Sequence, residues 1–325
     1  MSDLSSDDQL NLVVDGGGTK TDCCILRTSG EGVDVVGLGH AGSSNPVAVG
    51  FDSAVSAIAL AASEALAAAP SDIASAQIVR AAFALAGTLD DEVRLSLEQR
   101  LAKLGLANRC RVFPDVLPIV LAASPEGEGA ALIAGTGSVS AVRHKDGRLA
   151  VTGGWGYLLG DEGSGFAIGR EAIRLTLAEL ETGATKSPLS EQVQASLGAN
   201  SIDQIKRAIY QQDDPRRRLA SLAELVLQAA SSGDTTAEAI LTGAASDLSE
   251  LLAQGLTRLD LPRDPLQVAI SGGLMSAQSP LRAAVVEKVE ERFGSATICF
   301  VANPLLACQR LVCDEYFKAP LRIVT

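Results

Sequence analysis

A pattern of three short strands, with a glycine-rich turn between the first two, occurs twice in this 325-residue chain. The turn spans residues 16–19 in the first copy and 135–138 in the second, about 120 residues later. The expected strands cover residues 10–14, 22–27 and 33–38 in the first copy, and 129–134, 139–144 and 149–152 in the second. A repeat of this length predicts two related domains that arose by internal duplication.

Strand and helix patterns alternate through the rest of the chain. Strands are expected over residues 77–85, 111–113, 267–270 and 298–301, and helices over 49–69, 90–104, several stretches of 166–258, 276–292 and 304–317. This alternation predicts an α/β fold with domains at 11–116 and 117–325. The last helix is a candidate to pack back on the first domain, and the acidic residues 1–10 are expected to be disordered. The pattern leaves the tract 187–214 undecided.

The charge balance restricts the possible partners. The chain has 27 Lys and Arg against 39 Asp and Glu, a net charge of −12 and a pI near 4.7. Because phosphate backbones are bound by clustered basic residues, we expect no nucleic-acid partner. The one dense basic run, residues 216–218, is interpreted as a solvated face. The chain shows no apolar stretch of membrane-spanning length and no secretory signal, so we expect a cytoplasmic protein without a membrane partner.

Six cysteines and two histidines offer little metal chemistry. No pair of cysteines has the Cys-x-x-Cys spacing, so a zinc site is not expected. The cysteines are interpreted as reduced thiols that serve as small apolar side chains.

The two glycine-rich turns are the strongest chemical signal. A glycine turn lets backbone N–H groups approach an anion with no Cβ in the way, and Thr or Ser adds a hydroxyl donor. The segments Asp-Gly-Gly-Gly-Thr-Lys-Thr at 15–21 and Gly-Thr-Gly-Ser at 135–138 therefore favour a clamp on a polyphosphate. Neither has the Walker A spacing. The Gly-x-Gly-x-x-Gly at 37–42 runs into Ser-Ser-Asn-Pro rather than a helix, which argues against a dinucleotide site.

Three aspartates lie at the ends of predicted elements or in loops. Asp15 ends the first strand beside the first turn, where it is a candidate to hold the water shell of Mg²⁺. Asp115 follows a short strand and is placed either to accept a hydroxyl proton or to serve as a turn or cap residue. Asp161 lies in the segment 152–165, which has six glycines in 14 residues and is typical of a binding loop. Trp155, in the same segment, either stacks on a ligand or anchors the loop.

In this order, the motifs resemble those of N-acetylglucosamine kinases. The resemblance spans about residues 11–317, and its most specific part is Gly-Gly-Trp-Gly at 153–156 followed by Gly-Asp-Glu-Gly-Ser at 160–164. The family belongs to the actin, hexokinase and heat-shock-chaperone ATPase superfamily, in a branch shared with benzoyl-CoA reductase activators. The resemblance implies two duplicated actin/hexokinase-like (ribonuclease H-like) domains with an ATP and sugar cleft between them.

The resemblance also implies roles for individual residues, with Asp115 as the catalytic base. The residues expected to bind ATP are Gly17, Gly18, Thr19, Lys20, Thr136, Gly272 and Gly273. The residues expected to bind the sugar are Asn45, Ser138, Gly154, Trp155, Gly156 and Asp161. Three positions depart from the family pattern: Leu305 and Leu306 stand where a Gly-Ala pair near the nucleotide is expected, and Val139 replaces a polar residue of some relatives.

The implied activity is transfer of the γ-phosphoryl group of Mg-ATP to the 6-hydroxyl of N-acetylglucosamine, with ATP and Mg²⁺ as cofactors. Glucosamine and N-acetylmuramic acid are alternative substrates. A further alternative is an ATPase activator with an iron–sulfur cluster at a dimer interface, for which Cys23 and Cys24 are the cysteines nearest the phosphate loops. A sugar-sensing module without catalysis is another. A homodimer is the default expectation for the oligomeric state.

Overall fold

The structure is a computed structural model that describes residues 9–30, 32–74, 76–259, 261 and 265–324. The chain divides into two compact units. Unit 1 takes the residues up to Ala122 together with Asn303–Ile323, and unit 2 takes Ala123–Ala302 with the last residues from Val324. Residues 1–8 of the segment expected to be disordered lie outside the described residues. Gln9 and Leu10 of that segment instead begin the first strand, because they pair with β2.

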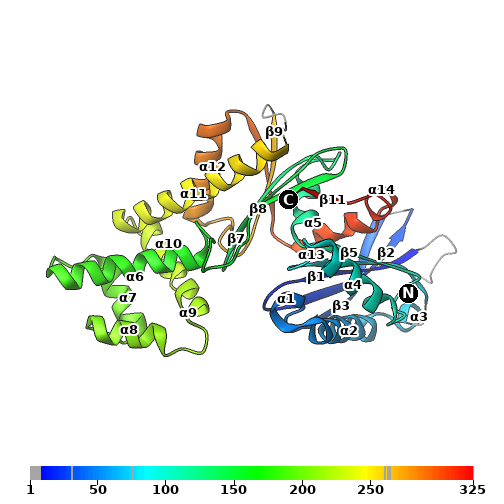
Figure 1. Ribbon diagram of the computed structural model, residues 1–325, viewed down its shortest axis with the longest axis horizontal. Helices are drawn as coiled ribbons and strands as arrows, with labels where there is room; N and C mark the ends of the chain where they lie inside the picture. The colour runs from blue at the N-terminus through cyan, green and yellow to red at the C-terminus, as the bar shows by residue number, and fades with distance from the viewer. Residues whose placement is uncertain (1–8, 31, 75, 260, 262–264, 325) are drawn as a thin grey trace. The chain divides into compact units, whose positions relative to one another are not determined.

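In the described part of unit 1, five strands form a mixed sheet in the order β3-β2-β1-β4-β5 (Figure 1). They are β1 (Gln9–Gly16), β2 (Thr21–Ser29), β3 (Gly32–Ala41), β4 (Ile78–Leu85) and β5 (Arg109–Pro114). β1 is antiparallel to β2 and parallel to β4, which is parallel to β5. The carboxyl ends of the three parallel strands therefore lie at one edge of the sheet, where ligands bind in open α/β sheets.

The sheet of unit 2 repeats this order. Its strands are β6 (Gly129–Ala134), β7 (Ser138–Arg143), β8 (Arg148–Gly153), β9 (Leu266–Ser271), β10 (Ala296–Val301) and the short β11 (Arg322–Val324), in the order β10-β9-β6-β7-β8-β11. β6 is antiparallel to β7 and parallel to β9, as β1 is to β2 and β4. When β6 to β10 are matched with β1 to β5, every strand has the same neighbours. The predicted duplicated, ribonuclease H-like fold is confirmed.

The helices in the first segment of unit 1 are α1 (Pro46–Val49), α2 (Phe51–Ala68), α3 (Ser71–Ala74), α4 (Asp91–Ala102) and α5 (Val116–Ala123). α2, α3 and α4 cover one face of the sheet, through Ile58, Ile73 and Leu97 of the cluster that they form with the strands. α2 lies so close to β3 that a Cβ on Gly37 would be 2.1 Å from the carbonyl oxygen of Ala65, and one on Gly39 2.0 Å from that of Ala61. The glycines at 37 and 39 therefore serve helix-on-sheet packing. The helix expected over 49–69 is α2, which begins two residues later, at Phe51, because Gly50 with a φ of 81° separates it from α1.

By length and composition alone, α2 could also cross a membrane, with a mean hydropathy of 1.3. The buried residues of this helix are Ala54, Ile58, Ala61, Ala62 and Ala65. All of them except Ala54 belong to a hydrophobic cluster that also includes residues of β1, β2 and β4. The apolar character of this helix is thus explained by its packing on the sheet, as in a core helix.

The C-terminal segment packs on the other face of the same sheet (Figure 1). The single helix expected over 304–317 is three short pieces, α13 (Pro304–Ala307), the 3-10 helix η1 (Cys308–Val312) and α14 (Asp314–Phe317), because Cys313 is extended. Arg80 donates a hydrogen bond to the carbonyl of Val312, and Arg111 donates one to that of Tyr316. These arginines alternate with Ala81 and Val112, which face the cluster on the α2 side, so they point to the opposite face.

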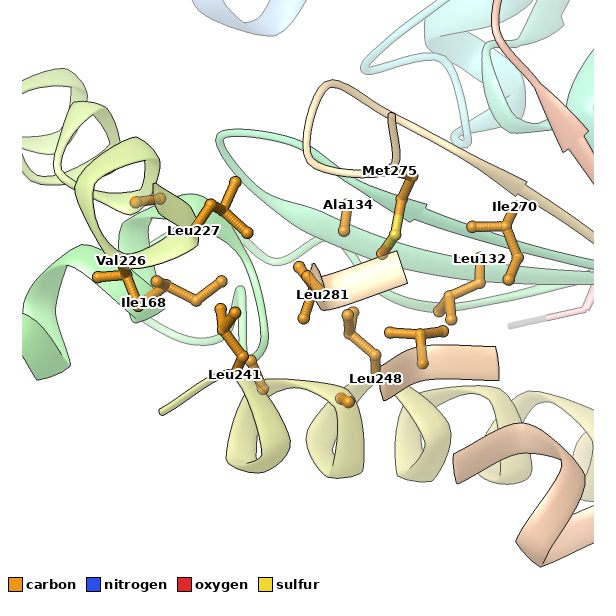
Figure 2. Packing of buried hydrophobic residues seen from close by; sticks show 14 of the residues in the cluster. Leu132, Ala134, Ile168, Val226, Leu227, Leu241, Leu248, Ile270, Met275 and Leu281 are labelled. Atoms are coloured by element: carbon orange, nitrogen blue, oxygen red, sulfur yellow. The ribbon is translucent and has the colours of Figure 1, made fainter. Parts of the chain in front are cut away.

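The core of unit 2 lies between its sheet and two long helices, α11 (Thr235–Leu259) and α12 (Pro280–Phe293). Figure 2 shows Leu132 and Ile270 of the strands beside Leu248 of α11 and Leu281 of α12. The core continues to α6 (Gly165–Thr182) and α10 (Ala223–Ser231) through Ile168 and Val226. The tract 187–214 forms two helices, α7 (Pro188–Leu197) and α8 (Ile202–Tyr210), each capped by a serine. α9 (Pro215–Ser221) follows.

We predict that Gly39→Ala destabilises unit 1 by about 2–3 kcal/mol, because the added methyl would force α2 away from β3. Gly30→Ala is the control, since a Cβ there meets nothing within 4 Å. Urea unfolding followed by circular dichroism checks this. Equal midpoints for the two variants would contradict the packing role of Gly39.

Candidate functional site

The first glycine-rich turn links β1 to β2 at the ligand-binding edge of unit 1. The N–H of Gly17 donates to the carbonyl of Lys20 over 2.9 Å, which closes the turn. A Cβ on Gly16 would lie 2.1 Å from Ser44 Oγ, so only glycine fits there. Gly18 and Thr19 are exposed, and a Cβ on Gly18 would meet nothing within 4 Å. The turn therefore has an open backbone at Gly18, on a base fixed by close packing at Gly16.

Two of the predicted functional carboxylates belong to this same edge. Asp15 is in β1 and Asp115 directly follows β5, with β4 between the two strands. Burial, together with the charges of Asp115 and Asp22, raises the pKa of Asp15 to about 7. Burial raises the pKa of Asp115 to about 6, although the backbone N–H groups of Val116 and Asp115 itself lower it. A carboxyl group with a pKa near 6 is well suited to general-base chemistry at neutral pH.

The predicted ATP ligand Lys20 is engaged within the turn. Its Nζ lies 2.6 Å from Asp22 Oδ2, and Asp22 Oδ1 lies 2.7 Å from His40 Nδ1. The hydrogen bond to Asp22 is the main cause of a raised Lys20 pKa. The side chain of Lys20 is 71% exposed, so it is free to exchange this partner for a phosphate.

Asn45, the predicted sugar ligand of unit 1, caps a helix. Its Oδ1 accepts hydrogen bonds from the N–H groups of Val47 (3.0 Å) and Ala48 (3.3 Å) at the start of α1. A Cβ on Gly87, whose φ is 77°, would lie 2.4 Å from the same oxygen. These contacts orient the side chain and leave its amide nitrogen as the donor for a ligand.

The second glycine-rich turn links β6 to β7 and docks on the start of α6. The N–H of Gly135 closes the turn by donating to the carbonyl of Gly137 over 2.9 Å. In return, the carbonyls of Gly135 and Thr136 accept hydrogen bonds from the N–H groups of Gly165 (2.8 Å) and Phe166 (3.3 Å). The first amides of α6 are thus used to hold the turn.

The Ser-Gly-Gly segment after β9 reaches the same turn. A Cβ on Gly272, whose φ is 112°, would lie 2.1 Å from the carbonyl oxygen of Ala134, so glycine is required. A Cβ on Gly135 would come within 4.0 Å of the nitrogen of Gly273. Thr136 and Gly273, predicted to bind ATP, thereby line one cavity of about 280 Å³. The remaining lining residues are Gly135, Gly165, Arg217, Ala220, Ser221 and Leu274.

Ser138 and Asp161, predicted to contact the sugar, bond to each other and to the protein. The Ser138 N–H donates to Asp161 Oδ1 over 3.2 Å, and its hydroxyl donates to the carbonyl of Glu162 over 2.7 Å. Asp161 Oδ2 lies 3.2 Å from an Arg216 nitrogen. Asp161 is only 3% exposed and has a positive φ of 67°. The structure therefore gives Asp161 a role that the sequence analysis missed, in holding the second turn.

The rest of the predicted sugar loop is open. Gly154 and Gly156 have positive φ angles of 68° and 82°, and the N–H of Gly154 donates to the carbonyl of Ser138 over 3.1 Å. Trp155 is 65% exposed and lies near Gly160 of the same loop. Leu305 and Leu306, which stand where a Gly-Ala pair is expected, lie in α13 of unit 1.

Two duplicated ribonuclease H-like units, each with a glycine-rich turn at the same strand junction, define the actin/hexokinase class of ATP-binding proteins. The chain belongs to the BadF/BadG/BcrA/BcrD ATPase family, whose profile matches residues 12–305.

Two curated proteins with similar sequences are named as sugar kinases. An N-acetylmuramic acid/N-acetylglucosamine kinase of Clostridium acetobutylicum is 29% identical over 191 residues, 59% of this chain and 62% of that protein. An N-acetyl-D-glucosamine kinase of Dictyostelium discoideum is 27% identical over 187 residues, 55% of this chain and 58% of that protein. The matches thus span about three fifths of the length of these curated relatives.

Solved structures match over nearly the whole chain. A candidate N-acetylglucosamine kinase from Chromobacterium violaceum has a TM-score of 0.69 and 26% identity, and covers 94% of this chain and 99% of that one. A ROK family glucokinase from Streptomyces griseus, in complex with glucose and AMPPNP, has a TM-score of 0.55 at 17% identity and covers 93% and 98%. The similarity to the glucokinase shows a shared fold only.

We predict that Asp161→Asn lowers the free energy of unfolding of unit 2 by about 1–3 kcal/mol, because it leaves Arg216 unpaired and weakens the hold on Ser138. Asparagine tolerates the positive φ, so backbone strain does not contribute. Trp155 fluorescence during urea unfolding measures the change. Glu250→Gln, at a more exposed ion pair with Arg292, should differ from the unsubstituted protein by about 0.5 kcal/mol or less.

We also predict that Asp115→Asn stabilises the protein at pH 8 in the absence of nucleotide and magnesium. Because the folded-state pKa of Asp115, about 6, exceeds its ordinary value of 3.8, its ionisation destabilises the fold as pH rises through this window. The gain should be about 1–3 kcal/mol at pH 8 and should vanish near pH 4. Urea unfolding across this range tests it, with the exposed Asp52→Asn as control. A gain independent of pH would contradict the assignment.

Proposed function

We propose that the protein is an ATP-dependent amino-sugar kinase that transfers the γ-phosphoryl group of Mg-ATP to the 6-hydroxyl of N-acetylglucosamine. The observation that carries the proposal is that each unit has a glycine-rich turn at the same strand junction, at 16–19 and 135–138, and that unit 1 also has a carboxyl group at a strand end whose pKa is about 6. The names of the relatives from Clostridium acetobutylicum and Dictyostelium discoideum support the same chemistry.

In this reaction Asp115 accepts the proton of the sugar hydroxyl while the oxygen attacks the γ-phosphorus. The backbone N–H groups of the two turns, with Thr19 and Thr136, bind the phosphates. Phosphoryl transfer needs little covalent help from a protein, so positioning and charge neutralisation provide most of the acceleration. The Asn45 amide nitrogen is the donor that unit 1 offers to the sugar.

Asp15 fits a role toward magnesium. Its carboxyl group is partly buried beside Asp22 and Asp115, and their like charges help to raise its pKa. A divalent cation near Asp15 would relieve this repulsion and would balance the charge on the phosphates of ATP. Mg²⁺ keeps most of its waters and needs only one or two protein carboxylates, which suits a single aspartate at a strand end.

The activator alternative is disfavoured by the burial of the thiols it would use. Cys23 and Cys24 are fully buried in β2, and burial raises the pKa of both well above the ordinary value. A bridging cluster needs thiolates that reach a surface. The free thiols and the use of ATP also favour a cytoplasmic setting.

The experiment is a coupled ADP-release assay with Mg-ATP against N-acetylglucosamine, glucosamine, N-acetylmuramic acid and glucose. We expect sugar-dependent turnover on N-acetylglucosamine. Turnover on only one of the other amino sugars would identify that sugar as the substrate in place of N-acetylglucosamine. ATP binding without turnover on any of the sugars would contradict the kinase assignment.

We predict that Asp115→Asn lowers kcat on the active sugar by about 100-fold or more, the usual size of a general-base contribution, while sugar binding changes little. Turnover is followed by ADP release and sugar binding by calorimetry. Asp52→Asn removes an exposed carboxylate of unit 1 and should leave both unchanged. Unchanged turnover in Asp115→Asn would exclude it as the base.

A further inference from the structure

The three consecutive arginines of α9 have different surroundings: the interpretation as a solvated face holds for the exposed Arg217, whereas Arg216 and Arg218 are half-buried and bonded to the protein. Arg216 pairs with the buried Asp161 over 3.2 Å, and a guanidinium nitrogen of Arg218 donates to the carbonyl of Ser196 over 2.9 Å. Arg217 lies between them, and its guanidinium has no hydrogen-bonding or ionic partner among the described residues. This side chain lines the cavity formed by Thr136 and Gly273.

The chemistry of that cavity leaves one strong anion-binding group. Its lining residues besides Arg217 are glycines, alanine, leucine, threonine and serine, so none of them carries a charge. The Ser221 hydroxyl is already used, because it donates to the carbonyl of Arg218 over 2.8 Å. An anion in the cavity would therefore meet neutral N–H and hydroxyl donors on one side and a single guanidinium on the other.

The packing of α9 fixes the backbone from which the exposed Arg217 side chain extends. Asp214 Oδ1 accepts the N–H of Arg217 over 2.9 Å and caps the helix. On the other side, a Cβ on Gly169 of α6 would lie 1.9 Å from the carbonyl oxygen of Leu219, so α6 and α9 touch backbone to backbone. Gly165 of α6 also donates to the carbonyl of Gly135 in the second turn. The turn and α9 are thus positioned by the same helix.

We propose that Arg217 binds a phosphate group of the nucleotide held in this cavity. The inference rests on the proposed function, since it assigns a residue to the ATP site of that reaction. A guanidinium offers paired N–H donors that match two oxygens of one phosphate, which the glycine turn alone does not supply. Arg217 therefore contributes to phosphate binding and leaves recognition of the base to the rest of the cavity.

The test compares Arg217→Gln with Arg218→Gln, because both remove one positive charge from the same helix. Binding of ADP and of adenosine to the full chain is measured by calorimetry. We expect Arg217→Gln to weaken ADP binding about tenfold or more, with adenosine binding changed less than twofold. Arg218→Gln should leave both unchanged, and Arg217→Lys should recover part of the ADP affinity. Equal thermal unfolding of the variants without ligand shows that the fold is intact.

Each other outcome has a definite meaning. Equal ADP affinities for Arg217→Gln and Arg218→Gln would overturn the assignment while leaving the proposed function in place. An equal loss of ADP and adenosine affinity would show that Arg217 contacts the nucleoside and would overturn a phosphate role. Failure of the unsubstituted protein to bind ADP would overturn the proposed function and this inference with it.

Discussion

The fold depends on points where two backbone segments approach more closely than any side chain allows. Gly37 and Gly39 leave room for backbone carbonyls of α2, and Gly272 leaves room for the backbone carbonyl of Ala134. Gly169 admits the carbonyl of Leu219. Close packing of this kind leaves little room for adjustment, so the strand ends and the helix that carry the turns are held in place. The turns themselves stay open because they project beyond these contacts.

The two copies of the fold have diverged in how they treat charge. In unit 1, the pKa values of the half-buried Asp15 and Asp115 are raised, and the nearby Lys20 offsets the shift of Asp15 only in part. In unit 2, the buried Asp161 is balanced by Arg216 and by the N–H of Ser138. The first copy thus holds carboxyl groups with raised pKa values, whereas the second uses its carboxylate to hold the second turn.

The sequence predicted the elements whose signals are local. Short apolar runs bounded by turn residues located every strand of both sheets except the short β11, and the helix expected over 90–104 begins after its N-cap Asp90, whose side chain accepts the N–H of Val93. What could not be predicted depends on contacts between distant residues. The partnership of Asp161 with Arg216 joins positions 55 apart, and nothing local distinguishes Arg216 from Arg217. The break at Cys313 likewise follows from packing on a sheet built by the start of the chain.

The assignment of Asn303–Ile323 to unit 1 has a consequence for how the protein is made. Unit 1 covers one face of its sheet with helices from its first segment, but the other face also needs Asn303–Ile323, which are synthesised after residues 123–302 of unit 2. Nearly all of unit 2, except its edge strand β11, is therefore synthesised before unit 1 can be completed. Because newly made domains fold as units, the later half of this chain has the first opportunity to reach its native state. One face of the sheet of unit 1 therefore stays incompletely covered until synthesis has reached residue 323.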